Sequence, residues 1–218
     1  MKIPCETGYS FLRRGGSAGV QTSQAKAAFS LVEMLITLVL MIIMVTMLYG
    51  FGSSSHQKQQ KKNCQKNLQK IYVALEIFAN DHDGLFPMHA GARTAEEPLS
   101  LLVPRYTADT GPFICPGSKD SPLPSGESFV RRRISYAYLM GRRLTDSAEV
   151  LMSDRQVNAQ PKTKGERVFS GTGKTPGNNH HKYGGNFLFG DGHLEMSSAV
   201  APFPVNLTQG VVLLNPKP

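Results

Sequence analysis

The chain has 218 residues, of which 40% are hydrophobic and 18% charged, a balance typical of folded rather than disordered proteins. The net charge of +8 is concentrated in two places: residues 1–28 hold four basic residues and one acidic residue, and five lysines lie between residues 58 and 70. Basic residues on both sides of an apolar segment favour contact with anionic lipid over nucleic acid, which is not an expected partner. The sequence contains no nucleophile elbow, Walker loop, dinucleotide-binding fingerprint or zinc-protease helix. We therefore expect no enzyme and no cofactor.

Residues 1–28 are polar, rich in Gly, Ser and Ala, and without hydrophobic periodicity, so we interpret them as a disordered or removable leader. Residues 29–52 predict a transmembrane helix. The 18 residues from Met34 to Phe51 carry no charge, and a helix of that length spans about 27 Å, roughly the hydrocarbon core of a bilayer. No polar stripe follows this segment, as it would in a buried core helix. A secretory signal would have a shorter apolar region, of about 7–15 residues.

Residues 53–218 are expected to form an exported globular domain. The glycines and serines of residues 50–55 should weaken the helix where it leaves the membrane. A soluble helix is then predicted from His56 to Asn80, ended by the turn residues 80–84 and by Pro87. Its apolar residues recur at intervals of 4, 3, 4 and 3 and form one stripe: Cys64, Leu68, Ile71, Leu75 and Phe78. Such a stripe needs a partner surface, which we expect to be a β-sheet.

The predicted elements after residue 87 are short. Residues 99–103 predict one helical turn, and residues 116–128 and 156–179 predict loops. The strand candidates are residues 113–115, 134–139, 150–152, 186–189 and 193–196. The last two should form a hairpin around the Asp-Gly turn at residues 191–192. The predicted fold class is α+β: a long N-terminal transmembrane helix continues into a soluble amphipathic helix packed on a small, mainly antiparallel β-sheet.

Glu33 is the most informative single residue. A carboxylate several residues into a membrane helix costs roughly 2.5–3.5 kcal/mol on insertion scales. The side chain either reaches the headgroup level or has a partner. If the chain is cut between Ala28 and Phe29, a new α-amino cation appears at Phe29. In an assembly of parallel helices, Glu33 of one subunit would neutralise that cation on its neighbour.

Residues 28–33, AFSLVE, resemble the cleavage and methylation motif of type IV prepilins and type II secretion pseudopilins. In that family a basic leader is followed by a small residue, Phe, apolar or hydroxyl residues, and Glu at the fifth mature position. Here Ala28 stands where the family usually has Gly. The resemblance implies cleavage by a prepilin peptidase, N-methylation at Phe29 and assembly with other pilin or pseudopilin subunits through Glu33. It also implies a single-pass inner-membrane protein with a cytoplasmic N-terminus and a periplasmic or extracellular C-terminal domain.

A second resemblance lies near the C-terminus. His181 is followed by nine residues and then by Asp191 and Gly192, which is the H-x9-D-G motif of a pseudopilin subgroup. Residues 63–87, 113–116, 135–138 and 153–155 are also similar to that subgroup. The motif identifies the subgroup without implying a mechanism.

Two hypotheses compete for the motif residues. His181, Asp191 and His193 could hold a divalent ion in a membrane-anchored metal-dependent enzyme. On the structural hypothesis, which we favour, Asp191 and Gly192 form a turn and His181 bonds its backbone across the hairpin. Asp81 and Asp83 lack the full spacing of a calcium loop and are interpreted as a helix-ending turn.

The arginine run Arg131–Arg133 raises a third possibility. With Tyr136 and Tyr138 it could contact DNA phosphates, as in a DNA-binding minor pilin, or it could be a charged strand edge, which we favour. Charge alone also leaves the membrane orientation open, because five lysines follow the apolar helix against four basic residues in the leader.

Three cysteines are present, none with the CxxC spacing of a structural zinc site. If Cys5 leaves with the leader, Cys64 and Cys115 remain as an even pair in an oxidising compartment. A disulfide between them is one possibility, and it requires their Cα atoms to lie within about 7 Å. Otherwise Cys64 is a small core residue of the helix.

Overall fold

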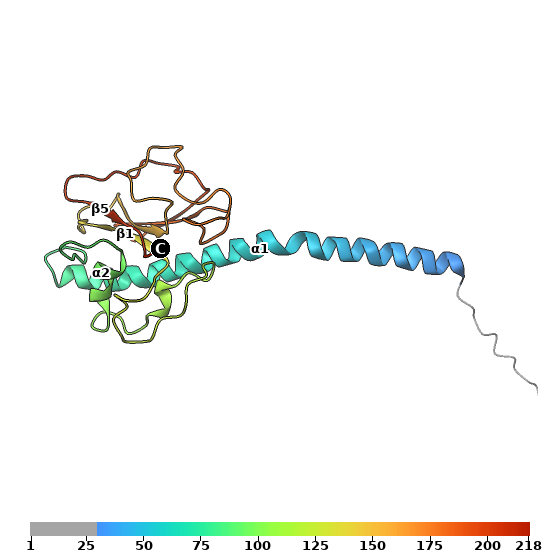
Figure 1. The fold of residues 1–218 in the computed structure, drawn as a ribbon, viewed down its shortest axis with the longest axis horizontal. Coiled ribbons are helices and arrows are strands. Elements are labelled where there is room, and N and C mark those ends of the chain that lie inside the picture. The colour runs from blue at the N-terminus through green and yellow to red at the C-terminus, as the bar shows by residue number, and fades with distance from the viewer. Residues whose placement is uncertain (1–29) are drawn as a thin grey trace, which may run out of the picture. The chain divides into compact units, whose positions relative to one another are not determined.

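The computed structural model describes residues 30–218, apart from the side chains of residues 49–54. Its helices are α1 (Leu31–Asn80), α2 (Glu96–Leu99) and the 3-10 turns η1 (Ser100–Leu102) and η2 (Gly111–Phe113) (Figure 1). Its strands are β1 (Tyr136–Met140), β2 (Val150–Asp154), β3 (Gly185–Phe189), β4 (Leu194–Ser197) and β5 (Val212–Leu214). The chain divides into two units, Met1–Met47 and Leu48–Pro218, which are described in turn. The predicted α+β fold is confirmed.

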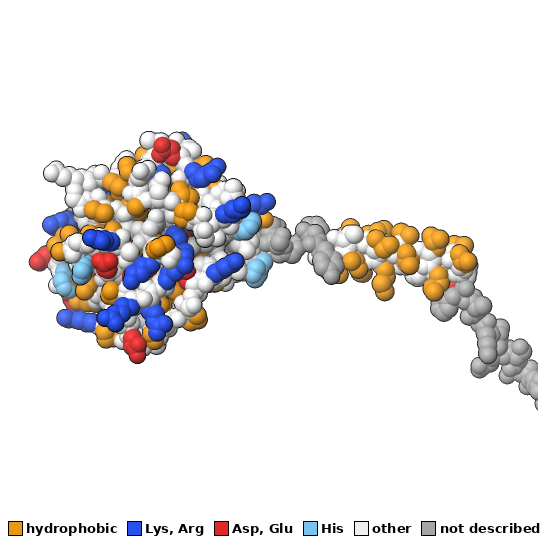
Figure 2. Space-filling view, viewed as in Figure 1, with side chains coloured by type: hydrophobic (Ala, Val, Ile, Leu, Met, Phe, Trp, Pro, Cys, Tyr) orange, Lys and Arg blue, Asp and Glu red, His pale blue; other side chains and the backbone are white. Residues whose placement is uncertain are grey.

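The described part of the first unit is the N-terminal stretch of α1. Leu31–Leu48 has a mean hydropathy of 2.7 and no buried residue. Among the described helices, α1 is the one long and apolar enough to cross a membrane, and a signal sequence near the N-terminus meets the same criterion. Thr37 and Thr46 donate their hydroxyls to carbonyls of their own helix, both at 2.9 Å. The described surface of this stretch is therefore almost wholly apolar (Figure 2).

The weak point expected at residues 50–55 does not end α1, which is continuous from Leu31 to Asn80. A glycine inside a helix costs about 1 kcal/mol relative to alanine, too little to break one of this length. The helix ends where predicted. Asp83 and Gly84 both have positive φ, and the Gly84 N–H donates to the Ala79 carbonyl at 2.8 Å. Asp81 and Asp83 thus belong to a helix-ending turn, as expected.

The second unit is built on the C-terminal half of α1. The predicted stripe is confirmed, since all five of its residues are buried in one hydrophobic core. The sheet contributes Tyr136, Tyr138, Met152, Leu188 and Leu214 to the same core. In Figure 1 the green segment after α2 lies largely across this half-helix from the strands. Contacts from both sides agree: Asn67 donates to the Ile114 carbonyl and Tyr72 to the Gly190 carbonyl, both at 3.0 Å.

The sheet has five antiparallel strands in the order β4-β3-β2-β1-β5. Alternate residues point to opposite faces. The face away from α1 packs against a second core in the long loops, and its residues include Ala137, Leu139, Phe187, Phe189 and Leu213. The predicted hairpin is confirmed by the β3–β4 register, which pairs Gly185 with Ser197 and Leu188 with Leu194.

Two expectations differ from the structure. Residues 113–115 are not a strand, because Gly111 and Pro112 begin the 3-10 turn η2 instead. The edge strand β5 was not anticipated, although Val212–Leu214 pairs with β1. The helical turn expected at residues 99–103 is confirmed and begins earlier, at Glu96.

Candidate functional site

A cluster of buried polar side chains lies where α1, the end of β2 and the start of β3 meet. Its centre is Asp154, the last residue of β2. The Asp154 Oδ2 accepts the backbone N–H of Asn186 at 2.8 Å and its Nδ2 at 2.9 Å, and Oδ1 accepts Asn179 Nδ2 at 3.0 Å. His180 Nε2 lies 3.2 Å from Oδ2, and both side chains are buried. We call Asp154, Asn179, His180 and Asn186 the Asp154 cluster.

The Asp154 cluster holds a buried negative charge. Burial by itself disfavours the carboxylate, but the facing His180 and the hydrogen bonds from Asn179 and Asn186 outweigh it, so the pKa of Asp154 lies below its ordinary value. The same charge acts on its surroundings. Burial and the Asp154 charge together raise the pKa of Tyr136 well above its ordinary value.

Lys61 connects this cluster to α1. Its Nζ donates to the carbonyls of Ser197 at 2.5 Å and Tyr183 at 3.1 Å, and its own carbonyl accepts Asn186 Nδ2 at 3.1 Å. Burial lowers the pKa of Lys61, and the charge of Asp154 partly restores it. One of the five lysines that follow the apolar stretch is therefore a packed core residue.

A disulfide lies against the Asp154 cluster. Cys64 on α1 is bonded to Cys115, just after η2, with a Cα–Cα distance of 5.4 Å. The Cys115 Sγ lies 3.6 Å from His180 Nε2 and accepts the Gly117 N–H at 3.3 Å. Both sulfurs are buried. Two cysteines, a histidine and a carboxylate thus meet at one point in the core.

The motif residues of the C-terminal hairpin lie elsewhere. Asp191 Oδ1 is 2.6 Å from His193 Nδ1 and accepts the His193 N–H at 3.0 Å, with both side chains about half exposed. That backbone hydrogen bond is the main reason why the pKa of Asp191 is below its ordinary value. Gly192 has φ +85 and lies against the Tyr72 ring. Asp191 and Gly192 therefore act as the predicted turn.

His181 does not join that turn. Its side chain is exposed, its φ is +55, and within residues 30–218 it makes no hydrogen bond to the hairpin. In the same residues, ligand atoms of three or more His, Cys, Asp or Glu gather in one place only, at Cys64, Cys115, Asp154 and His180. His181, Asp191 and His193 are thus not brought together as a metal site.

His181 instead borders a polar cavity of about 490 Å³. Other residues of its wall are Lys119, Asp120, Arg133, Arg155 and Gly173. The buried Asp120 carboxylate lies 2.9 Å from Arg133 Nε and 3.0 Å from Arg155 Nη2, and accepts the Ser135 hydroxyl at 2.6 Å. Its charge balances one of the two guanidinium groups.

The arginine run is placed in a turn before β1 rather than on a strand edge. Arg131 and Arg132 are exposed, whereas Tyr136 and Tyr138 are wholly buried. The Tyr138 hydroxyl donates to the Pro87 carbonyl at 2.9 Å. The two rings therefore do not share a surface with the arginines.

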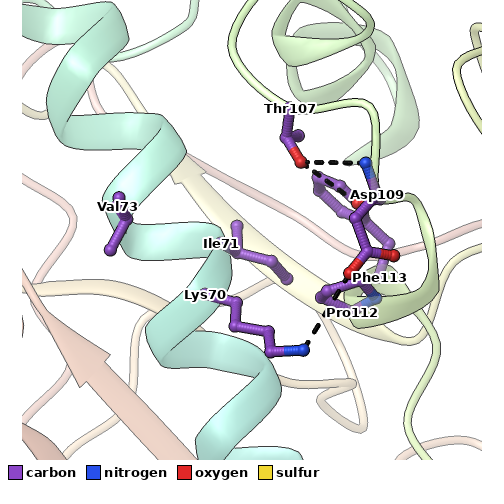
Figure 3. Close-up of a pocket in the computed structure, with 7 residues that line it drawn as sticks. All are labelled: Lys70, Ile71, Val73, Thr107, Asp109, Pro112 and Phe113. Carbon is purple, nitrogen blue, oxygen red and sulfur yellow. Dashed lines mark hydrogen bonds and ion pairs between the residues drawn. The ribbon is translucent and has the colours of Figure 1, made fainter.

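A smaller hollow of about 290 Å³ lies between α1 and the segment before η2. Figure 3 shows Lys70 reaching toward Asp109, at 3.9 Å, while Val73 lies on another side of the helix. The Lys70 and Asp109 side chains are both 65% exposed. An open hollow with one weak ion pair offers little chemistry.

Sequence reasoning missed the Asp154 cluster because its members come from separate segments. Two signals were present: Asp154 ends an apolar strand, and His180 precedes the motif histidine His181. A charged residue that ends a buried strand needs partners. The sequence does not show which residues supply them.

Comparison of the chain with family models, with curated proteins and with solved structures found no match. The function is therefore argued from the fold and the geometry. The architecture is pilin-like: an exposed apolar helical segment at the N-terminal side continues into a helix packed on an antiparallel sheet.

Proposed function

We propose that the chain is a structural pilin or pseudopilin subunit of a type II secretion or type IV pilus-like system. Residues 1–28 are its leader, Leu31–Leu48 lies in the inner membrane, and the second unit lies outside the cytoplasm. Its partners are the prepilin peptidase and other pilin-like subunits.

The observation that carries this proposal is the division of α1 into two chemically different halves. The half that packs on the sheet buries one stripe, while Leu31–Leu48 buries nothing. An apolar surface of that length is unstable in water. Either lipid or the same segment of neighbouring subunits must cover it. A pilin-like subunit has lipid around this segment before assembly and parallel helices of its neighbours around it in the filament.

Glu33 supports the same proposal. It lies in the first turn of α1, and no cation of residues 30–218 forms an ion pair with it. Cleavage before Phe29 would create an α-amino cation close to that depth. Ala28 and Phe29 lie outside the described residues, so this part of the proposal rests on the sequence motif.

Mass spectrometry of the N-terminus tests the processing step. The full chain is produced with a prepilin peptidase in a bacterial host, and the mature protein is expected to begin at N-methylated Phe29. Ala28→Gly should be cut at least as well, because Gly is the family's usual residue, and Ala28→Glu should stay uncut. An intact residue 1, or cleavage near Ser53, would refute the pilin reading.

Co-purification of two differently tagged copies tests assembly. Glu33→Val should insert and be processed, because it removes a buried charge, but should no longer recover its partner copy. Glu76→Gln is the matched control, since Glu76 is an exposed carboxylate on the same helix outside the apolar half. Equal recovery of all three proteins would show that Glu33 has no part in assembly.

A further inference from the structure

Four potential metal ligands converge in the core of the second unit. The Sγ atoms of Cys64 and Cys115, an oxygen of Asp154 and a ring nitrogen of His180 all lie within 4.8 Å of one another, and all four residues are buried. They come from α1, the segment after η2, the end of β2 and the loop before β3. Neither the pilin motif nor the proposed function uses them.

We propose that, when the two cysteines are reduced, these four side chains bind one zinc ion. Two thiolates, an imidazole and a carboxylate are all zinc ligands, and four of them complete a closed, tetrahedral structural site. We call this the Cys64–His180 site. The inference does not depend on the proposed function.

The spacing of the ligand atoms fits a tetrahedron. With zinc–nitrogen and zinc–oxygen bonds of about 2.0–2.1 Å and zinc–sulfur bonds of about 2.3 Å, nitrogen and oxygen ligands lie about 3.3 Å apart and nitrogen and sulfur ligands about 3.6 Å apart. His180 Nε2 lies 3.2 Å from Asp154 Oδ2 and 3.6 Å from Cys115 Sγ. The two distances from His180 Nε2 are therefore already those of a tetrahedral zinc site. Reduction of the disulfide frees the sulfurs to separate.

The surroundings resemble the outer shell of a metal site. Asn179 and Asn186 hold the Asp154 carboxylate in place, as outer hydrogen bonds do for metal-binding carboxylates. The Gly117 N–H donates to Cys115 Sγ at 3.3 Å, a contact that favours a thiolate. Two thiolates and a carboxylate around Zn²⁺ leave one net negative charge, and the Lys61 ammonium acts on the same carboxylate.

A newly made chain carries both cysteines as thiols, so zinc binding to it needs no reductant. Zinc binding displaces the two thiol protons into solution. A disulfide oxidant can later take two electrons from the sulfurs and two protons from solution, which forms the Cys64–Cys115 bond, reduces the oxidant to a dithiol and releases Zn²⁺. Either state ties α1 to the segment after η2.

Cobalt titration of the full chain in detergent tests the site. The protein carries Cys5→Ser, so that its only thiols are Cys64 and Cys115, and it is reduced with a phosphine and freed of metal. One equivalent of Co²⁺ should give thiolate charge-transfer bands and the intense d–d bands of a tetrahedral site, and Zn²⁺ should abolish them. The same protein, oxidised to the disulfide, should give neither band.

Variants separate this site from adventitious binding. His180→Gln should lose the tetrahedral bands, while His181→Gln, one residue away and exposed, should keep them. Asn186→Ala should weaken Co²⁺ binding about 10–100-fold, as for other outer-shell partners. Circular dichroism of each reduced protein establishes that it is folded.

Three results would overturn the proposal. A reduced, folded wild-type chain without thiolate–cobalt bands would show that the pair forms only a disulfide. Equal bands in the oxidised chain would place the metal elsewhere. Equal losses in His180→Gln and His181→Gln would show that His180 is not a ligand.

Discussion

Asp154 places a charge in the core, and its partners make that charge favourable. Replacement by Asn removes the charge that faces His180 and turns one of the two acceptor oxygens into an NH2 donor. Asp154→Asn should therefore lower the free energy of unfolding by roughly 3–5 kcal/mol at neutral pH in the disulfide-bonded chain. The pKa of Asp154 is lower in the folded than in the unfolded state. Its contribution is therefore present above the unfolded pKa of about 3.9 and is lost as the pH falls toward the folded pKa. Urea denaturation between pH 7 and pH 3 measures this.

The difference in unfolding free energy between wild type and Asp154→Asn should narrow below about pH 4, where the unfolded wild-type chain binds a proton at Asp154 before the folded state does. Asp191→Asn is the matched control. Asp191 also pairs with a histidine, but its side chain is 47% exposed, so the change should stay within about 1 kcal/mol. Equal losses in the two variants, or a difference that does not vary with pH, would contradict a buried charged Asp154.

The Cys64–Cys115 bond closes a loop of 51 residues in sequence separation. By chain entropy, a loop of that size stabilises the folded state by about 4 kcal/mol. In urea denaturation with a chelator present, the midpoint should therefore move to a lower urea concentration when a reductant is added. The double variant Cys64→Ala, Cys115→Ala should not respond to the reductant. Free alkylation of both thiols in the denatured, unreduced wild type would show that no disulfide forms.

Single residues were predictable where the reason was local. The Asp-Gly turn at residues 191–192 follows from backbone preference, and the structure gives Gly192 a φ of +85. The expected bond between His181 and that turn depended on how a loop returns to the sheet, and the structure does not contain it. The roles of Asp154 and His180 were not predicted for the same reason, because their contacts are with residues that are distant in sequence.

At the scale of elements, the β3–β4 hairpin is attached to α1 through its turn. Tyr72 donates its hydroxyl to the Gly190 carbonyl at 3.0 Å, and a Cβ on Gly192 would lie 2.6 Å from the Tyr72 ring. Gly192→Val should therefore lower the free energy of unfolding in two ways. A valine in the left-handed backbone conformation costs about 1–2 kcal/mol, and its side chain must also displace Tyr72. Thermal denaturation of the variant measures the total loss of stability.

Gly126→Val isolates the strain, because Gly126 has φ +70 and open space where its Cβ would lie. The loss in Gly192→Val should exceed that in Gly126→Val, and adding Tyr72→Ala should remove most of the excess. If Tyr72→Ala leaves the excess unchanged, the ring is not what the new side chain meets.

Periodicity predicted the elements that have a strong pattern and missed those that do not. The stripe of α1 and the alternation of Phe187, Leu188 and Phe189 each fit one period, and both were correct. Residues 113–115 are apolar, but Gly111 and Pro112 favour a tight turn before them. β5 is three residues long and forms only by pairing with β1, so no local pattern identifies it.

For the whole molecule, the sequence pattern predicted two chemically distinct parts, and the structure has them. The apolar helix and the α+β unit followed from hydropathy and periodicity. The polar interior that joins α1, β2 and β3 did not, because it depends on how the elements pack. Lys61 illustrates the limit: it is one of five similar lysines in the sequence, and only the fold shows that it is buried.

Membrane orientation is the last property to test, because basic residues near both ends of the apolar stretch oppose each other. The proposed function requires the second unit outside, so a protease added to spheroplasts should digest it. Replacing exposed lysines after the stretch (Lys62, Lys66 and Lys70 to Gln) should increase the digested fraction, while Arg13→Ala with Arg14→Ala should decrease it. Lys61 is left unchanged because its hydrogen bonds hold the fold.

Lys119→Gln with Lys174→Gln is the control, since both are exposed and remote in sequence from the apolar stretch. It should leave the orientation unchanged. The Cys64–Cys115 bond reports independently, because disulfides persist in oxidising compartments and cytoplasmic thiols stay reduced. Chains digested from outside should carry the disulfide and protected chains should not. A wild-type second unit that resists external protease in intact spheroplasts, and is digested only after lysis, would place it in the cytoplasm and end the pilin proposal.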